Sequence, residues 1–242
     1  MGLNETEAFV LRTYKLAEAD KIVLLLTRKV GLLRGVARGA RKLKSRFGAG
    51  LELFTLVSLD YYEKETRELV SIRQTEILRS YFHLANDPKV VSALNHLSDL
   101  LIEFTPPHDP NEKLFRMIRA CLDAIAAAPE DADDVTRYFE VWLLKLSGFL
   151  PDIRTCATCR QTIRNGASLS GNNTLQCTAC ATNHRLKLGA EAYARLRTLL
   201  STPPDVWAKQ GRNATDETQR QLAQLTRQLI TTALERTPHS QR

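Results

Sequence analysis

The sequence contains little cysteine, and it lacks the long apolar runs that would place it in a membrane. Cysteine accounts for 5 of the 242 residues, and a chain of this length buries enough surface to fold without disulfides. No stretch approaches the about 18–20 apolar residues of a membrane span. Residues 1–9 carry two acids and no basic side chain, which is unlike a secretory signal. We therefore expect a reducing, cytoplasmic location and no membrane partner.

The composition is that of an ordinary globular protein, with 43% hydrophobic and 25% charged residues, and this excludes wholesale disorder and collagen-like or coiled-coil architecture. The formal net charge of +7 is unevenly distributed. Residues 1–80 have a balance of +5, residues 81–155 of −5 and residues 156–242 of +7. The two changes of sign predict three regions, two of which are basic enough to face a polyanion.

The first region reads as strands. Short β-rich runs occupy residues 8–14, 21–27, 31–37, 51–62 and 69–78. Alternation is clearest in the fourth run, where Leu51, Leu53, Thr55, Val57, Leu59 and Tyr61 share one face. Five successive strands without a helical segment predict a small antiparallel barrel or sandwich. Both an OB-fold and an SH3-like barrel fit this pattern.

No acid occurs between Arg28 and Arg46, a segment that holds eight basic residues. They are Arg28, Lys29, Arg34, Arg38, Arg41, Lys42, Lys44 and Arg46. Cations neutralise phosphates, and interspersed glycines let backbone amides approach them. Because so many like charges repel one another, we favour nucleic-acid contact over a merely solvated loop. Phe47 could stack on a base, although packing beneath the barrel is the favoured interpretation.

The second region reads as helices. Asp87-Pro88 predicts a helix start and Pro106-Pro107 its end, and Asp109-Pro110-Asn111-Glu112 repeats the start signal, with Glu112 placed to complete a capping box. A third helix is expected over residues 134–147, with Trp142 in the core, and later ones over residues 189–200 and 217–234. Cys121 lies on an apolar stripe, which indicates a buried, inert thiol. The acids at positions 130, 131, 133 and 134 favour helix-dipole stabilisation over metal binding.

The third region contains two C-x-x-C pairs, formed by Cys156, Cys159, Cys177 and Cys180, with 17 residues between the pairs. This spacing is typical of a zinc ribbon, in which four thiolates complete a tetrahedron and leave no open position. We therefore predict one structural Zn²⁺ per chain, with His184 as an unneeded alternative ligand. The segment between the pairs is expected to bury little apolar surface and to depend on the metal for order. Disulfides or a redox C-x-x-C are disfavoured by the compartment and by the duplication.

Taken together, the chain resembles the bacterial recombination mediator family RecO. The resemblance is carried by TEAFVLRTYKLAEADKIVLLLTRKVGLLRGVARGARK near the start, by LELFTLVSLDYYEK, and by LLKLSGFLPDIRTCATC before the second half of the ribbon. It covers nearly the whole chain and is weakest over the last ~40 residues.

The resemblance implies an α+β architecture, with an OB-fold DNA-binding domain over residues 1–80 and a helical domain over residues 81–242 that carries the zinc ribbon at about 152–186. It also implies binding of single- and double-stranded DNA and annealing of complementary strands. Partners would be RecR, the single-stranded-DNA-binding protein SSB through its acidic tail, and RecA indirectly, with the protein in the cytoplasm at the nucleoid. DNA contacts would fall on Arg34, Arg38, Arg41, Lys42, Lys44 and Arg46, and zinc on the four cysteines.

Two other functions fit parts of the sequence. A zinc-dependent nucleobase deaminase would need an H-x-E element, but no histidine here is followed two positions later by glutamate. We therefore expect no catalytic residues. A zinc-ribbon transcription or RNA-binding factor remains an alternative that only the family resemblance argues against.

Overall fold

The computed structural model describes residues 2–64, 68–182 and 184–236 of the chain. These residues fall into two compact units, Met1–Arg116 and Met117–Arg242, and the division lies within a helix. Each unit buries its own apolar side chains. None of the described helices combines the length and the apolar character that crossing a membrane requires.

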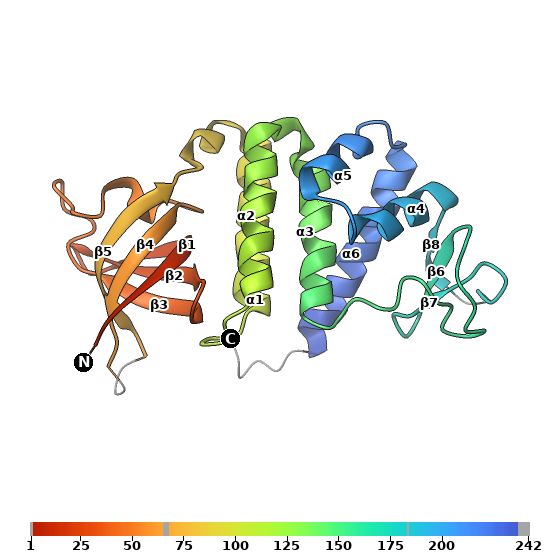
Figure 1. Ribbon diagram of the computed structural model, residues 1–242, viewed down its shortest axis with the longest axis horizontal. Helices are drawn as coiled ribbons and strands as arrows, with labels where there is room; N and C mark the ends of the chain where they lie inside the picture. Colours follow the sequence, from red (N-terminus) through yellow and green to blue (C-terminus); the bar gives the residue numbers. More distant parts are fainter. Residues whose placement is uncertain (1, 65–67, 183, 237–242) are drawn as a thin grey trace. The chain divides into compact units, whose positions relative to one another are not determined.

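Five strands of the first unit form a closed barrel (Figure 1). They are β1 (Leu3–Leu16), β2 (Asp20–Thr27), β3 (Gly31–Ala37), β4 (Leu56–Tyr62) and β5 (Val70–Arg79). Their order is β1-β2-β3-β5-β4, and pairing of β4 with β1 closes the barrel. Neighbouring strands are antiparallel except β3 and β5, which are parallel. This Greek-key barrel confirms the predicted OB-fold, and the SH3-like alternative does not apply.

The barrel interior is filled by alternate residues of the strands, as the period of two predicts. The buried cluster consists of Ala8, Val10, Val23, Leu25, Leu33, Ala37, Phe47, Leu51, Val57, Leu59, Tyr61, Val70 and Ile72. Gly35 allows β3 and β5 to approach closely, because a Cβ there would lie 2.7 Å from Cγ1 of Ile72. The register of these two strands therefore depends on a residue without a side chain.

The fourth strand is shorter than its sequence pattern predicts. A strand over residues 51–62 was expected, but Gly48–Leu51 forms a 3₁₀ turn, η1, and β4 begins at Leu56. Phe54 adopts a left-handed backbone conformation, with φ of 55°. Leu51 and Phe54 are nevertheless buried. Phe54 is outside the predicted face, and Leu53, which is on it, is only half-buried, so the alternation is interrupted before β4 begins.

Helical segments complete the first unit: η2 (Phe82–Asn86), α1 (Pro88–Phe104) and the start of α2 (Glu112–Ala127). The side chain of Asp87 accepts a hydrogen bond from the amide of Lys89, which confirms the predicted helix start. Asn111 caps α2 by accepting from the amide of Leu114. The predicted capping box is wrong, because Glu112 pairs with Arg28 instead.

The second unit combines the rest of α2 with further helices and a small sheet. The helices are η3 (Pro129–Asp131), α3 (Ala132–Leu146), α4 (Ala190–Leu199), α5 (Pro204–Gly211) and α6 (Asp216–Arg236). The strands are β6 (Ala167–Ser170), β7 (Leu175–Gln176) and β8 (His184–Leu188), and their order in the sheet is β7-β6-β8. Trp207 of α5 is fully buried, whereas Trp142, the predicted core residue, is only half-buried. Helix α5, which the sequence analysis did not predict, begins directly after Pro203 with Pro204, and proline is tolerated at the first helical position.

Candidate nucleic-acid interface and metal centre

All six predicted DNA-contact residues belong to the barrel unit, and all six side chains are exposed. Arg34 projects outward from β3, and the other five lie in the connection that leads from β3 to η1. Within the part of the chain that the structure describes, none of the six forms an ion pair with a carboxylate. Their charge is therefore available to an anionic partner.

The connection that carries these cations is held against the turn between β1 and β2. The amide of Arg41 donates to the carbonyl of Ala19 at 2.9 Å, and its guanidinium donates to the carbonyls of Ala17 and Glu18 at 3.0 and 2.8 Å. The amide of Gly39 donates to Oδ1 of Asp20 at 2.8 Å. The sequence had suggested that glycine amides in this segment would approach a phosphate. The amide of Gly39 is instead bonded within the turn.

Phe47 anchors the other end of the same connection. Its side chain is only 3% exposed and belongs to the barrel core, with the guanidinium of Arg46 4.9 Å above its ring. The favoured interpretation of Phe47, packing beneath the barrel, is confirmed. Base stacking would have to come from another aromatic residue.

The first two cations of the acid-free run have a different role. Arg28 is bonded to Glu7 at 3.0 Å and to Glu112 at 2.7 and 2.8 Å. These carboxylates raise the pKa of the guanidinium, mainly through the hydrogen bonds that Arg28 donates to Glu112. Lys29 donates to the backbone carbonyl of Glu5. Arg28 and Lys29 are thus bonded to other residues of the barrel unit, which their position in the sequence did not reveal.

Strand pairing adds cations that the sequence analysis missed. Lys15 is opposite Lys21 in the register of β1 and β2, and Lys21 is opposite Ala37, the residue before Arg38. Ile72 is opposite Ala37 on the other side, so Arg73 and Arg38 directly follow the last paired residues of β5 and β3. These residues are separated by up to about 60 positions in sequence. Lys15, Lys21 and Arg73 could be identified only from the strand register of the barrel.

In the second unit, the four predicted cysteines come together. The sulfur atoms of Cys156, Cys159, Cys177 and Cys180 all lie within 4.8 Å of one another. The Sγ atoms of Cys159 and Cys177 are 3.9 Å apart, close to the about 3.8 Å expected for two sulfurs on one tetrahedral Zn²⁺ with Zn–S bonds of about 2.3 Å. Four thiolates suit a soft divalent cation, so this cluster could hold a metal ion. The side chain of His184, the alternative ligand, lies outside the described residues.

The four sulfur atoms lie in two backbone turns, and hydrogen bonds in these turns change the pKa values of the thiols. The amide of Cys177 donates to Sγ of Cys156 at 3.3 Å. Burial raises the pKa of Cys156, but amide donation from Cys159, Cys177 and Thr158 outweighs it and brings this pKa to about 6. Hydrogen bonding to Cys177 and Cys159 raises the pKa of Cys180 to about 12. Crowded thiolates repel one another, and a divalent cation relieves that repulsion.

The segment between the cysteine pairs is better packed than its composition predicted. Ile163, Ala167, Leu169 and Leu175 are all buried. The hydroxyl of Tyr193, on α4, donates to the carbonyls of Ile153 and Ile163 at 2.9 and 3.1 Å. The small sheet therefore has support from α4 in addition to any metal.

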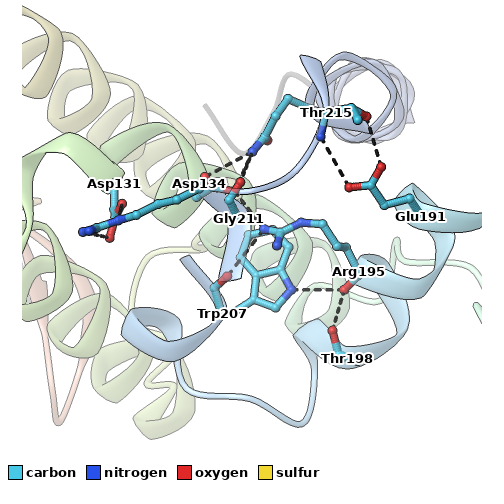
Figure 2. Close-up of polar contacts among 10 residues, drawn as sticks. Asp131, Asp134, Glu191, Arg195, Thr198, Trp207, Gly211 and Thr215 are labelled. Carbon is cyan, nitrogen blue, oxygen red and sulfur yellow. Dashed lines mark hydrogen bonds and ion pairs between the residues drawn. The ribbon is translucent and has the colours of Figure 1, made fainter. Parts of the chain in front are cut away.

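The acidic cluster before α3 is used within the fold. Arg212 binds Asp131 at 2.7 Å and Glu130 at 2.9 Å. Arg195 binds Asp134 at 2.9 Å, and both are labelled in Figure 2. Within the described residues, the cysteines form the one group suited to a metal ion. Cys121 is fully buried, and burial raises the pKa of its thiol, which confirms the inert interpretation.

The chain is similar to known proteins along its whole length. Residues 1–81 match the family model for the N-terminal part of recombination protein O, and residues 85–242 match the model for its C-terminal part. DNA repair protein RecO of Koribacter versatilis is 35% identical over 165 residues, which are 68% of this chain and 67% of that protein. The RecO protein of Pelobacter propionicus is 32% identical over 203 residues, 84% of this chain and 81% of the relative.

Proposed function

The chain belongs to the RecO family of DNA repair and recombination proteins, and from this premise we propose that it is a non-enzymatic recombination mediator. In this proposal it anneals complementary strands and, together with RecR, helps to load RecA onto single-stranded DNA coated with SSB. It would act in the cytoplasm at the nucleoid. The observation that carries the proposal is the group of six exposed cations without carboxylate partners on the described part of the OB-fold barrel.

The proposed mechanism is electrostatic. Each phosphate that Arg34, Arg38 or a neighbouring cation neutralises releases condensed counterions, so binding is favoured by entropy and weakens as salt rises. Two strands held on basic surfaces repel each other less than they do in free solution. The barrier to base pairing falls as a result, and no bond of the DNA is made or broken by a protein side chain.

We also propose that the cysteine cluster holds one structural Zn²⁺. The four sulfur ligands leave no position for a substrate or an activated water. The metal would join the two C-x-x-C turns, which are 17 residues apart in sequence, and so close the end of the small sheet. Its contribution is to stability, and the DNA contacts of the barrel do not require it.

Strand annealing by variants tests the proposal. Arg41 supports its own loop, so the informative variant is Arg34→Ala with Arg38→Ala, which removes charge and leaves the hydrogen bonds of Arg41 in place. We expect weaker DNA binding, a salt slope flatter by about 0.9 for each phosphate that is no longer neutralised, and slower annealing of SSB-coated strands. Arg220→Ala is the matched control, because Arg220 is exposed but paired with Glu217 on α6. Unchanged annealing in the double variant, or a wild-type protein that binds RNA in preference to DNA, would refute the mediator role.

A further inference from the structure

A row of outward-facing apolar side chains crosses the barrel beside the cations. Tyr14 is opposite Ile22, Ile22 is opposite Val36, and Val36 is opposite Ser71. The next residues along these strands, Val23, Ala37 and Ile72, belong to the core. Because side chains alternate between the two faces of a strand, the row faces outward.

The row lies just beyond the part of the barrel that is covered by helices. Other outward residues of β2 and β3, such as Leu24 and Leu32, are buried. Phe9 of β1 packs against Phe115 with ring centroids 5.0 Å apart, and Arg12 is ion-paired with Asp99 of α1. Two residues further along β1, Tyr14 is 46% exposed. Ile22 and Val36 beside it are half-buried.

Charge divides the outer surface of the barrel. Arg34 is two positions from Val36 along β3 and Arg73 is two positions from Ser71 along β5, so both share the outward face of the row, and the exposed Arg38 follows the end of β3. Lys15 and Lys21 alternate with Tyr14 and Ile22 and lie on the other face of their strands. Glu5 is opposite Asp60 where β1 meets β4, and Glu76 lies on β5 opposite Ser58, both away from the row. One acid, Asp20, is two positions before Ile22 on β2 and shares its face. An anionic strand that followed the arginines would pass over the apolar row, and the carboxylate of Asp20 beside it already accepts a hydrogen bond from the amide of Gly39.

We propose that Tyr14, flanked by Ile22 and Val36, is a stacking platform for the bases of single-stranded DNA. The inference rests on the proposed DNA binding and adds strand selectivity to it. Cations alone would hold single strands and duplexes alike, since both present phosphates. In a duplex the base faces are already stacked inside the helix, whereas a single strand can lay a base on an exposed ring. The platform therefore makes the barrel bind single strands more tightly than duplexes, with little dependence on base sequence.

The test compares Tyr14→Ala and Tyr14→Phe with the wild-type full chain by fluorescence anisotropy. The probes are oligo-dT, an abasic oligomer of the same length, and a duplex. We expect Tyr14→Ala to bind oligo-dT about tenfold more weakly and the duplex less than twofold more weakly, in line with stacking of one base. Tyr14→Phe should retain the affinity, because the ring remains. The wild type should bind the abasic oligomer as weakly as Tyr14→Ala binds oligo-dT.

The control is Phe82→Ala, which removes an aromatic side chain that is 60% exposed on η2. It should change neither affinity. Equal losses for single strand and duplex in Tyr14→Ala, or no loss, would overturn the platform and leave the cationic interface standing. Failure of the wild type to bind any DNA would instead refute the proposed function together with the platform. Circular dichroism of each variant shows that the barrel is folded.

Discussion

At the scale of single residues, the cations of the acid-free run fall into two groups that their sequence does not distinguish. Arg28 is bonded to two carboxylates, one of them 84 positions away. Arg34 is exposed on the barrel and has no carboxylate partner among the described residues. A cation that already has partners in the fold gains less from a phosphate than one that has only water around it. The two arginines should therefore respond differently to substitution.

Replacing Arg34 by alanine should lower the affinity for DNA and flatten its salt slope by about 0.9, while the thermal midpoint stays within error. Arg28→Ala should do the reverse, with a lower thermal midpoint and an unchanged salt slope. DNA titrations at several salt concentrations and thermal melts of both variants measure the difference. An equal loss of DNA affinity in the two variants would contradict this division of roles.

Gly211 illustrates how one residue can set the packing of several helices. Asp134 accepts from Arg195 and from Gln219, and the guanidinium of Arg195 lies 4.1 Å above the ring of Trp207 (Figure 2). A Cβ on Gly211 would overlap both the carboxylate of Asp134 and the guanidinium of Arg195. The site therefore admits glycine alone without rearrangement.

We predict that Gly211→Ala destabilises the second unit by about 1–3 kcal/mol, the usual cost of overpacking, and by more if the buried pair of Arg195 and Asp134 breaks. Chemical denaturation followed by tryptophan fluorescence reports the change, because Trp207 is part of the cluster. Gly171→Ala is the control, since a Cβ at Gly171 meets nothing within 4 Å. If both variants unfold at the same denaturant concentration as the wild type, the packing argument is wrong.

At the scale of elements, the ribbon depends on two kinds of support. The cysteine turns bring four sulfurs within 4.8 Å of one another. The sheet of β6, β7 and β8 is also held by buried apolar residues and by the hydroxyl of Tyr193. Loss of the metal should therefore loosen the turns more than the sheet.

For Cys177→Ser combined with Cys180→Ser, we expect the metal content to fall from about one Zn²⁺ per chain to near zero and the thermal midpoint to decrease. Hydrogen exchange should rise most in the turns at residues 156–160 and 177–180. Elemental analysis of protein purified under reducing conditions, without chelator, gives the metal content. Cys121→Ala should keep the full metal content, because its sulfur is not part of the cluster. Zinc below about half an ion per wild-type chain would count against a four-cysteine zinc site.

At the scale of the whole molecule, the position of the domain boundary affects the stability of the barrel. We propose that DNA binding resides in residues 1–80, as expected from the sequence. Helix α1 nevertheless contributes to the barrel, because the hydroxyl of Ser98 donates to the carbonyl of Leu11 at 2.7 Å and Asp99 pairs with Arg12. Without α1, buried outward residues such as Leu11 would become exposed.

A fragment of residues 1–80 and one of residues 1–116 should both bind DNA with the same salt slope, but the shorter one should melt at a lower temperature. The shared salt slope follows because the six cations lie before residue 47. Melting curves and anisotropy titrations of the two fragments make the comparison. A short fragment that is as stable as the long one would show that α1 does not support the barrel.

The sequence by itself determined the strand count of the barrel, most helix starts and the four cysteines that come together in the second unit. These features depend on local periodicity, on capping residues and on the spacing of two short motifs, all of which are readable along the chain. The sequence did not predict that Phe54 is buried from an irregular backbone segment. It also did not predict helix α5, which begins at Pro204.

Only the tertiary structure decided which of the described cations are free of carboxylates, that Phe47 is buried and that Tyr14 lies exposed beside Ile22 and Val36. The physical reason is that each of these properties depends on partners distant in sequence. Glu112 binds Arg28 from 84 positions away in sequence, and the pairing of β3 with β5 ends at Ala37 and Ile72, the residues before Arg38 and Arg73. Strand register and long-range ion pairs, and not composition, thus separate a structural arginine from one available to DNA.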